Sequence, residues 1–492
     1  MTLTEFINEP KSLLIAAAGH GKTHAIAECV QLCPEGQCQL ILTHTHAGIA
    51  SIKAKLAALK VDTKKYHVET ITSFAQSYAL AYCKADSLPE PSDKTYFRLV
   101  QEKALKVFSS PHILDVVKAT YAGLFVDEYQ DCEALQHAII MKLAQVLPVH
   151  VLGDKLQGIF SFVGRLVDFD QDLQGFVPFE LEKPWRWHKD GNCKELGDKI
   201  LEWRNVLLSD NKTIRLASDR KANVEVCIAA YEAMEHQQAY FQMLRKIIGL
   251  VDSDSLLIIV PSYQGEFRRM GDITDRVKIK DRFDYENRFW LAEAIDDKSF
   301  YSNANRADDL IGGIGRARKK EQRILEFMDG LSFNLTDLGK WFDRQHDCRL
   351  IDKQKENKAK SDHLAEIYKR FLANPSKRGV DELICFFQKE AGMKPKRREV
   401  VASLQHCLRN YPEDMTVYEA MYETRNAIRR GGRKIQGRCI GTTLLTKGLE
   451  FDTVIVLDAH RFEDSKNFYV AISRACKRLV IISKTPTLHF VN

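Results

Sequence analysis

The chain has 492 residues, of which 45% are hydrophobic and 28% are charged, and Lys plus Arg exceed Asp plus Glu by 72 − 66 = +6. This is the composition of an ordinary globular protein, and it excludes a disordered chain or a coiled-coil rod. The length predicts roughly three domains at about 150 residues each, and so small a basic excess permits nucleic-acid binding without indicating it.

Short apolar runs of the kind found in buried strands recur along the chain. The first set lies at 13–15, 40–42, 124–126 and 149–152, and a second set lies at 256–260, 454–457 and 479–482. Continuous apolar runs that alternate with helical patterns are typical of parallel sheets covered on both faces. From about 276 to 430 charged residues crowd together and helical periodicity dominates. We therefore predict an α/β protein with two cores, the second interrupted by a helical insertion.

A phosphate-binding loop is predicted directly after the first apolar run. Residues 16–23 read AAAGHGKT and precede a helical pattern. Backbone N–H groups of such a loop converge on phosphates, and the helix N-terminus adds a partial positive charge. We expect Lys22 to reach the β- and γ-phosphates of ATP and the Thr23 hydroxyl to bind Mg²⁺, although Ala16 stands where the strict pattern has glycine.

An acidic pair follows the apolar run 124–126 and supplies the partner that such a loop needs. Asp127 is expected to hold the Mg²⁺, and Glu128 is expected to act as a base that orients water. The loop and the acidic pair together predict an enzyme that hydrolyses ATP.

Longer segments around and beyond these motifs form a recognisable set: LTHTHAGIA (42–50), TITSF (70–74), VDEYQDCEALQ (126–136), VLGDKLQGIFSF (151–162), LEKPWRW (181–187), LLTKGLEFDTVIVLD (444–458) and FYVAISRACKRL (468–479). These segments resemble the motifs of superfamily 1A DNA helicases of the UvrD, Rep and PcrA type. They occur in the family's order over nearly the whole chain. The resemblance implies two RecA-like P-loop NTPase domains with ATP in the cleft between them.

The resemblance also implies a division of the chain. The first RecA-like domain would span 1–180 and carry a small insertion at about 78–118. The second would be assembled from 181–275 and 431–492, with the mainly helical insertion at 276–430 between its two parts.

Roles for individual residues are implied as well. Nucleotide binding would fall to Ala18, Gly19, His20, Gly21, Lys22, Thr23 and His24, with Gly448 and Glu450 near the nucleotide. Gln157 would sense the γ-phosphate and Trp185 would stack on adenine. Arg186 and Arg474 would reach the γ-phosphate from the second domain and neutralise charge in the transition state.

The resemblance places further residues along a track for single-stranded DNA. They are Thr43, Thr45, Thr72, Ser73, Phe74, Phe160, Phe162 and Thr442. Hydroxyls bond to backbone phosphates, and aromatic rings stack on bases without reading sequence. Each of these residues is equally compatible with packing at a strand end.

The implied function is an ATP-dependent translocase or helicase that moves 3′ to 5′ on single-stranded or tailed duplex DNA. A second interpretation is a DNA-end or nucleotide sensor, as in the compact UvrD-like subunit of Gabija anti-phage systems, which acts beside an OLD-family nuclease with a Toprim domain. The short insertion at 78–118 favours this alternative. A third interpretation is a scaffold that binds nucleotide without turnover, and the intact Lys22, Asp127 and Glu128 oppose it.

The selectivity for the nucleotide base stays open. The family has a glutamine upstream of the loop that reads adenine, and Asn8 is the nearest substitute for it in this sequence.

Cysteine usage and hydropathy bear on the compartment. The twelve cysteines form no C-x-x-C pair, so we expect reduced thiols rather than a metal site. No stretch approaches the ~18 apolar residues of a membrane helix, and the first residues lack the pattern of a secretory signal. We expect a cytoplasmic protein with no membrane partner.

Overall fold

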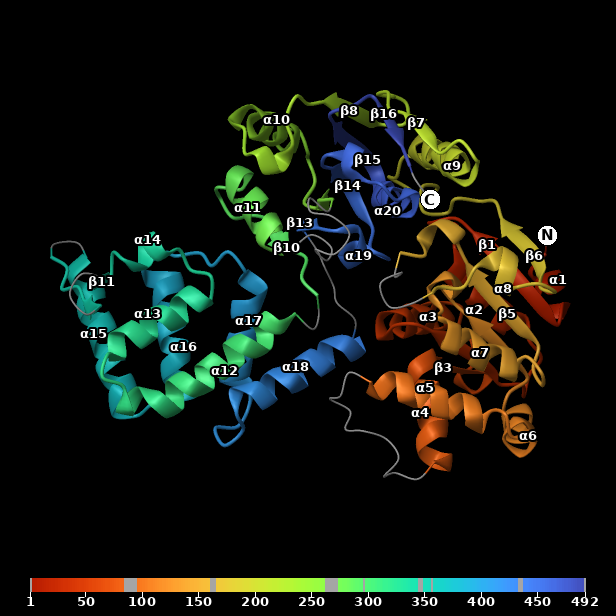
Figure 1. Ribbon diagram of the computed structural model, residues 1–492, viewed down its shortest axis with the longest axis horizontal. Coiled ribbons are helices and arrows are strands. Elements are labelled where there is room, and N and C mark those ends of the chain that lie inside the picture. The colour runs from red at the N-terminus through yellow and green to blue at the C-terminus, as the bar shows by residue number, and fades with distance from the viewer. Residues whose placement is uncertain are drawn as a thin grey trace.

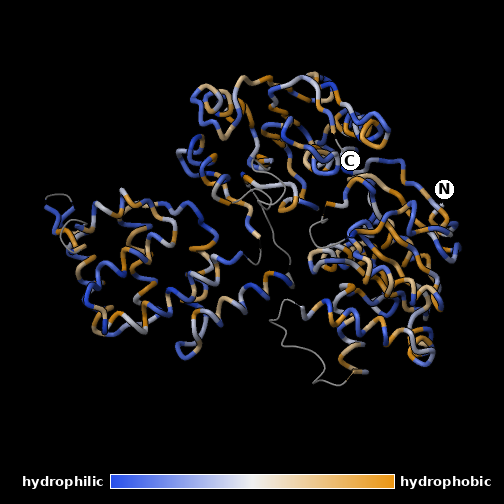
Figure 2. Tube along the Cα trace, viewed as in Figure 1, coloured by the Kyte–Doolittle hydropathy of each residue, from blue (hydrophilic) through white to orange (hydrophobic). Residues whose placement is uncertain are grey.

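The computed structural model describes residues 2–83, 95–159, 165–261, 273–294, 297–343, 348–354, 357–431 and 437–490. Two six-stranded sheets, each with helices on both faces, lie next to one another, and a layer of helices extends from the second sheet (Figure 1). Hydrophobic segments lie inside all three parts (Figure 2). The α/β prediction of two cores is confirmed.

The first sheet is parallel throughout, in the order β3-β2-β4-β5-β1-β6. Its strands are β1 (Lys11–Ala16), β2 (Gln39–Thr43), β3 (Tyr66–Thr70), β4 (Gly123–Val126), β5 (Val149–Gly153) and β6 (Val177–Leu181). Every residue of β2, β4 and β5 is buried, because helices cover both faces. The edge strand β6 contains Pro178 and is largely exposed, as expected of proline in a sheet.

Two groups of helices cover this sheet. One face carries α1 (Leu3–Asn8), α2 (Lys22–Leu32) and α3 (His46–Ala58). The other carries α4 (Ile71–Tyr82), α5 (Tyr96–Val107), α6 (Pro111–Thr120), α7 (Ala134–Leu143) and α8 (Phe169–Asp172). We call the first sheet with these helices the first domain.

The insertion expected at 78–118 is integrated into the first domain in its described part. The hydrophobic core that contains Leu124 of β4 also contains Val100 of α5, Phe108 at the end of α5, and Val117 of α6. The helices of this segment therefore cover the sheet and do not form a separate body with a core of its own among the described residues.

The second sheet is also parallel, in the order β10-β13-β9-β14-β15-β8. Its strands are β8 (Val224–Ile228), β9 (Leu256–Ile259), β10 (Trp290–Leu291), β13 (Arg438–Gly441), β14 (Phe451–Val456) and β15 (Ala475–Ser483), and a small antiparallel pair joins β7 (Thr213–Arg215) to β16 (Thr487–His489). One face packs on α9 (Lys194–Leu208) and α20 (Ser465–Ile472), and the other on α10 (Gln238–Gly249) and α11 (Ile273–Phe283). The short α19 (Thr443–Thr446) follows β13. These elements form the second domain.

The helical layer has a hydrophobic core of its own, which runs from Phe300 to Met421. Its helices are α12 (Lys298–Gly313), α13 (Lys320–Gly330), α14 (Leu335–Leu338), α15 (Lys358–Ala373), α16 (Lys377–Cys385), α17 (Arg398–Asn410) and α18 (Val417–Gly431), with a short hairpin of β11 (Phe342–Asp343) and β12 (Arg349–Leu350). Strand β10 lies within the range 276–430 but belongs to the second sheet, so the helical layer begins after it. The other end of the layer, α18, runs beside α3 of the first domain.

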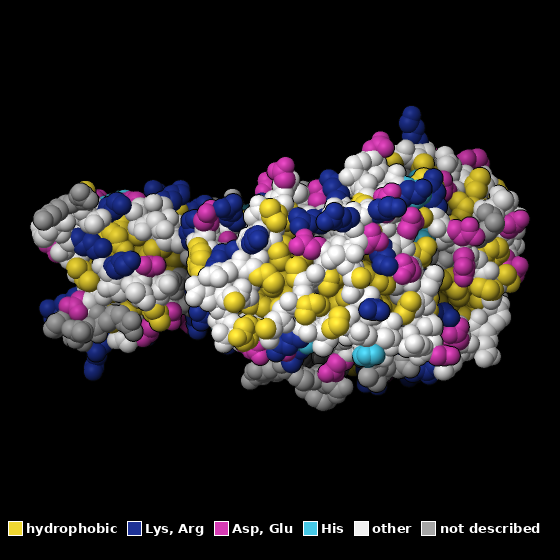
Figure 3. All heavy atoms as spheres, turned by 90° about the horizontal axis from the view of Figure 1, so that it is seen from above, with side chains coloured by type: hydrophobic (Ala, Val, Ile, Leu, Met, Phe, Trp, Pro, Cys, Tyr) yellow, Lys and Arg dark blue, Asp and Glu magenta, His cyan; other side chains and the backbone are white. Residues whose placement is uncertain are grey.

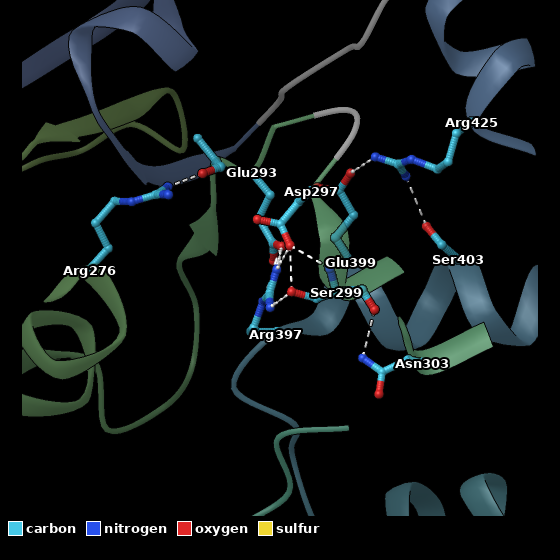
Figure 4. A network of polar contacts seen from close by, with 10 residues as sticks. Arg276, Glu293, Asp297, Ser299, Asn303, Arg397, Glu399, Ser403 and Arg425 are labelled. Carbon is cyan, nitrogen blue, oxygen red and sulfur yellow. Dashed lines mark hydrogen bonds and ion pairs between the residues drawn. The ribbon is translucent and has the colours of Figure 1, made fainter. Parts of the chain in front are cut away.

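A buried polar network joins the second domain to the helical layer (Figure 4). Arg397, at the N-cap of α17, donates to Glu293 just after β10 at 3.1 Å and to Asp297 before α12 at 3.1 Å. The Glu293 side chain is fully buried and that of Arg397 is 11% exposed. In the same network Arg425 of α18 lies over the Phe300 ring at 3.6 Å. These contacts hold α12, α17 and α18 in a fixed position relative to the second sheet.

Replacing Arg397 by Ala is expected to destabilise the protein by about 3 kcal/mol or more, because it leaves the buried carboxylate of Glu293 with too few partners. The free energy of unfolding, obtained from urea titration, measures this effect. Lys369→Ala, on the exposed side of α15, serves as the control and should leave that free energy within about 0.5 kcal/mol of wild type. Equal free energies of unfolding for both variants would contradict the importance of the network.

Candidate functional site

Three neighbouring strands of the first sheet end at one edge and bring the predicted nucleotide-binding residues together. Strand β1 leads into the loop before Lys22, β4 leads into Asp127, and β5 leads into Asp154. The carboxyl ends of parallel strands are the usual place for a ligand in open α/β sheets.

The loop has the geometry of a phosphate cradle. Gly19 and Gly21 have φ of 74° and 89°, and α2 begins at Lys22. The Lys22 ammonium donates to the Ala16 carbonyl at 2.9 Å, and the Thr23 hydroxyl donates to Asp127 at 3.3 Å. Thr23 and Asp127 thus present two oxygens side by side, the hard donors that Mg²⁺ prefers while phosphates and water complete its shell.

His20 of the loop and His24 of α2, both predicted to bind nucleotide, differ in environment. His20 is buried, its Nδ1 lies 3.0 Å from the Ala18 carbonyl, and burial lowers the pKa of its imidazole. His24 pairs with Glu28 at 3.5 Å on the partly exposed side of α2. His20 is therefore a neutral structural part of the loop at pH 7.

Two adjacent carboxylates lie at the centre of the site. Burial and the neighbouring Glu128 raise the pKa of Asp127 to about 7. Burial also acts to raise the pKa of Glu128, but Lys22 and Lys447 outweigh it and bring that pKa below the usual value. Glu128 is thus ionised at pH 7 and available as a base, whereas a metal ion would keep Asp127 deprotonated.

Gln157 lies in the 3₁₀ turn η4 (Lys155–Gln157) after β5. Its side-chain amide donates to Asp154 at 3.0 Å, and its carbonyl accepts from Lys447 of the second domain at 2.6 Å. Lys447 also contacts Asp131 at 2.5 Å. The predicted γ-phosphate sensor is therefore held between the two domains.

The segment 184–187 leaves the first domain and packs directly on the loop. The Arg186 amide donates to the Gly19 carbonyl at 2.9 Å, and a Cβ at Gly19 would lie 2.7 Å from that of Arg186, so only glycine fits. Trp185 is 50% exposed, and its ring lies 3.1 Å from where a Cβ of Gly21 would be. A large aromatic face therefore borders the loop, as stacking on a nucleotide base requires.

The second predicted arginine, Arg474, is 1% exposed at the end of α20. It donates to the Val470 carbonyl at 2.9 Å and to the Ser473 hydroxyl at 2.8 Å. Burial and the nearby Arg186 lower its pKa to about 10, and Glu128 partly offsets this, so Arg474 stays charged at pH 7. Both arginines thus lie at the interface of the two domains, Arg186 against the loop and Arg474 within electrostatic reach of Glu128.

Gly448 and Glu450 follow Lys447 in the second domain, close to the contacts that Lys447 makes with the first domain. Gly448 has φ of 82°, a conformation that glycine adopts without strain. Glu450 pairs with Arg186 at 3.1 Å. Glu450 therefore orients an arginine.

The residues expected along a DNA track divide into three groups. Thr45 caps α3 by accepting from the Gly48 amide at 3.0 Å, and Thr72 and Ser73 lie part-exposed at the start of α4. Thr43 and Thr442 are 2% and 4% exposed. Phe160 and Phe162 lie outside the described residues.

The expectation that Phe74 stacks on a base is wrong. Phe74 is 1% exposed, and its ring stacks on Phe108 at 5.8 Å in the core of the first domain. It follows the N-cap of α4 at the inner face, where hydrophobic packing on the sheet determines its direction.

Several residues that join the two domains next to the loop were missed by the sequence reasoning. Tyr469 accepts from the Ala18 amide at 2.9 Å, and Arg204 of α9 donates to Asp154 at 3.0 Å. Asp154 and Tyr469 lie within segments that carried the resemblance, which was the available signal. Arg204 lies outside every such segment, and an arginine in an amphipathic helix gives no sequence signal.

Two further observations concern metal and membrane. Among the described residues no group of three or more His, Cys, Asp and Glu side chains is arranged to hold a metal ion. None of the described helices is long and apolar enough to span a bilayer.

On the face shown in Figure 3, basic and acidic side chains are intermixed.

Comparison with known proteins gives a family match for one part of the chain. Residues 2–163 match the family model of an AAA domain. No curated protein matches the chain. The matched residues contain the loop, Asp127, Glu128 and Gln157.

Solved structures that match include Pif1 helicases. Pif1 from Bacteroides with ADP-AlF3 and single-stranded DNA is 14% identical with a TM-score of 0.26, covering 51% of this chain and 56% of that one. Bacteroides sp Pif1 with ADP-AlF4 is 15% identical with a TM-score of 0.28 (52% and 52%), and Candida albicans Pif1 is 12% identical with a TM-score of 0.27 (51% and 53%). The chain thus spans about half the length of these matching structures.

Replacing Trp185 by Ala is expected to weaken nucleotide binding about 30-fold, because stacking of a base on an aromatic ring contributes about 2 kcal/mol. Titration with a fluorescent ATP analogue measures the Kd. Tyr231→Ala, which removes an exposed aromatic ring outside the crevice, is the control. An unchanged Kd for Trp185→Ala would remove the ring from the binding site.

Proposed function

We propose that this chain is an ATP-dependent motor of the superfamily 1 DNA helicase type, which hydrolyses ATP between its two parallel-sheet domains and moves on single-stranded DNA. The observation that carries the proposal is the group of charged side chains that meet where the two domains pack together. Lys22, Asp127 and Glu128 come from the first domain, and Arg186 and Arg474 lie against them from the second.

The arrangement supports a defined chemistry. The loop and Lys22 would hold the β- and γ-phosphates, while Glu128 would take the proton of a water that attacks the γ-phosphorus. The bond from that phosphorus to the ADP oxygen breaks, and inorganic phosphate leaves. Mg²⁺ held by Thr23 and Asp127 would neutralise phosphate charge, and the two arginines would stabilise the charge of the transition state.

Contacts between the domains support a motor over a simple hydrolase. Bonds from Tyr469 to the loop and from Lys447 to Asp131 and Gln157 connect the second domain to the groups nearest the γ-phosphate. Loss of the γ-phosphate would therefore change the forces on the second domain directly. Alternation between two such states against a bound strand produces translocation, for which we propose the 3′ to 5′ direction.

A second function is favoured by the first insertion. Its described helices cover the sheet, so they offer no separate body that would grip duplex DNA. We therefore keep as the alternative a DNA-end or nucleotide sensor that regulates a partner nuclease, such as an OLD-family enzyme with a Toprim domain, in an anti-phage complex of the Gabija type.

Glu128→Gln is expected to lower the rate of DNA-stimulated ATP hydrolysis by about 10³-fold, because general-base catalysis contributes about 10² to 10⁴. Lys22→Ala should abolish both binding and turnover. Steady-state release of phosphate measures the rate, and Glu180→Gln on the exposed edge strand β6 is the matched control. Full activity of Glu128→Gln would refute the catalytic assignment.

Helicase and sensor are separated by measuring strand displacement and ATPase activity on the same DNA. The helicase proposal predicts displacement of a duplex with a 3′ tail and little displacement of one with a 5′ tail. Strong ATPase activity with negligible displacement on both substrates would instead support the sensor. Displacement only from the 5′ tail would overturn the proposed direction.

A further inference from the structure

An ion pair between the two domains lies next to the nucleotide-binding loop, and the proposed chemistry assigns it no role. Arg204 projects from α9 of the second domain and donates to Asp154, at the end of β5 in the first domain, at 3.0 Å. The Asp154 side chain is fully buried and that of Arg204 is 11% exposed. A buried pair of this kind, formed between domains, depends on how the domains are placed.

Asp154 is the centre of this arrangement. Besides Arg204, it accepts from the side-chain amide of Gln157 at 3.0 Å and from the Leu156 amide at 3.2 Å. Burial acts to raise its pKa, but Arg204 and Lys22 outweigh burial and bring the pKa below the usual value. Asp154 is therefore charged, and Arg204 is the principal source of opposite charge.

A second branch leads from Asp154 to the candidate base. The Asp154 amide donates to the side-chain oxygen of Gln130 at 3.0 Å, and the Gln130 amide nitrogen donates to Glu128. A Cβ at Gly153 would lie 2.6 Å from that Gln130 oxygen, so glycine at this position allows the close approach. The contacts of Arg204 and of Glu128 thus meet at Asp154, the first at its carboxylate and the second, through Gln130, at its backbone amide.

Tyr469 of α20 connects the same place to the loop. Its hydroxyl accepts from the Ala18 amide at 2.9 Å, and burial and Asp154 raise the pKa of its phenol. Burial acts to lower the pKa of Arg204, but Asp154 and Tyr469 outweigh it and raise that pKa. The loop, Gln157 and Glu128 are therefore all held through residues that Arg204 contacts.

We propose that Arg204 is a positioning residue for ATP hydrolysis: from the second domain it holds Asp154, and through Asp154 it orients Gln157 and Glu128 when the domains are closed. This proposal rests on the proposed ATPase function. Arg204 lies outside the resembling segments. In this role it makes the rate of ATP hydrolysis depend on how the two domains are placed.

A positioning role differs measurably from a merely structural one. A structural residue would affect ATP binding and turnover together, through loss of folded protein. Arg204 donates to Asp154 and not to Lys22, Thr23 or Trp185, which would hold the nucleotide, so its loss should lower kcat more than it weakens ground-state binding.

The first experiment compares Arg204→Ala, Arg204→Lys and the neighbouring exposed substitution Asn205→Ala in the full chain. We expect Arg204→Ala to lower kcat about 30-fold, which is about 2 kcal/mol at 1.36 kcal/mol per tenfold, with the KM for ATP changed less than about threefold. Arg204→Lys keeps the charge without the planar fork and should recover part of the loss. Asn205→Ala should behave as wild type.

A double-mutant cycle tests the pairing itself. Asp154→Asn combined with Arg204→Ala should lose no more activity than the worse single variant, because contacting residues are non-additive. Multiplied effects, or an unchanged kcat in Arg204→Ala while wild type is active, would overturn the proposal.

Hydrogen exchange separates this inference from the proposed function. The peptide that contains 154–159 should exchange about tenfold faster in Arg204→Ala than in wild type or Asn205→Ala, since local opening follows the loss of its contacts. Equal exchange would refute the role of Arg204 whether or not the protein hydrolyses ATP. A wild-type chain without ATPase activity would refute the proposed function alone, and if Arg204→Ala does not fold, Arg204→Lys carries the same comparison.

Discussion

Burial of several charges where the two domains meet is the constraint on which the rest of the site depends. Lys22 acts to lower the pKa of Asp127 and of Glu128, and Glu128 acts to raise the pKa of Asp127 and of Arg474. In water such groups would interact weakly, whereas burial makes their interactions strong and makes any unpaired charge costly. The protein meets this cost with a surrounding shell of carbonyls, hydroxyls and amides.

The parts of the fold that were predictable from sequence are those where burial leaves a simple signal. Strands β2, β4 and β9 are buried at every residue, so their apolar runs were recognisable. Strands β3 and β6 lie at the edges of the first sheet and carry polar residues, and β10 has only two residues. Pairing with a neighbour defines such strands, and pairing is not visible in a local pattern.

The same distinction holds for the site. Lys22, Thr23 and Asp127 were predictable, because phosphate and Mg²⁺ binding demand those residue types at the start of a helix and at the end of a strand, where the structure brings Thr23 and Asp127 into contact. Phe74 was misplaced, since a ring that suits stacking suits a hydrophobic core equally well. Arg204 could not be found from sequence, because only the tertiary structure brings α9 to the end of β5.

Helix α18 has a mechanical consequence. It has 15 residues and is therefore about 22 Å long at 1.5 Å per residue, and it packs on α12 and α17 of the helical layer and on α3 of the first domain. A tilt of about 10° would displace one end of a helix of that length by about 4 Å, roughly the spacing between consecutive Cα atoms. A small rotation of the helical layer against the first domain would thereby become a displacement of single-residue size along α3.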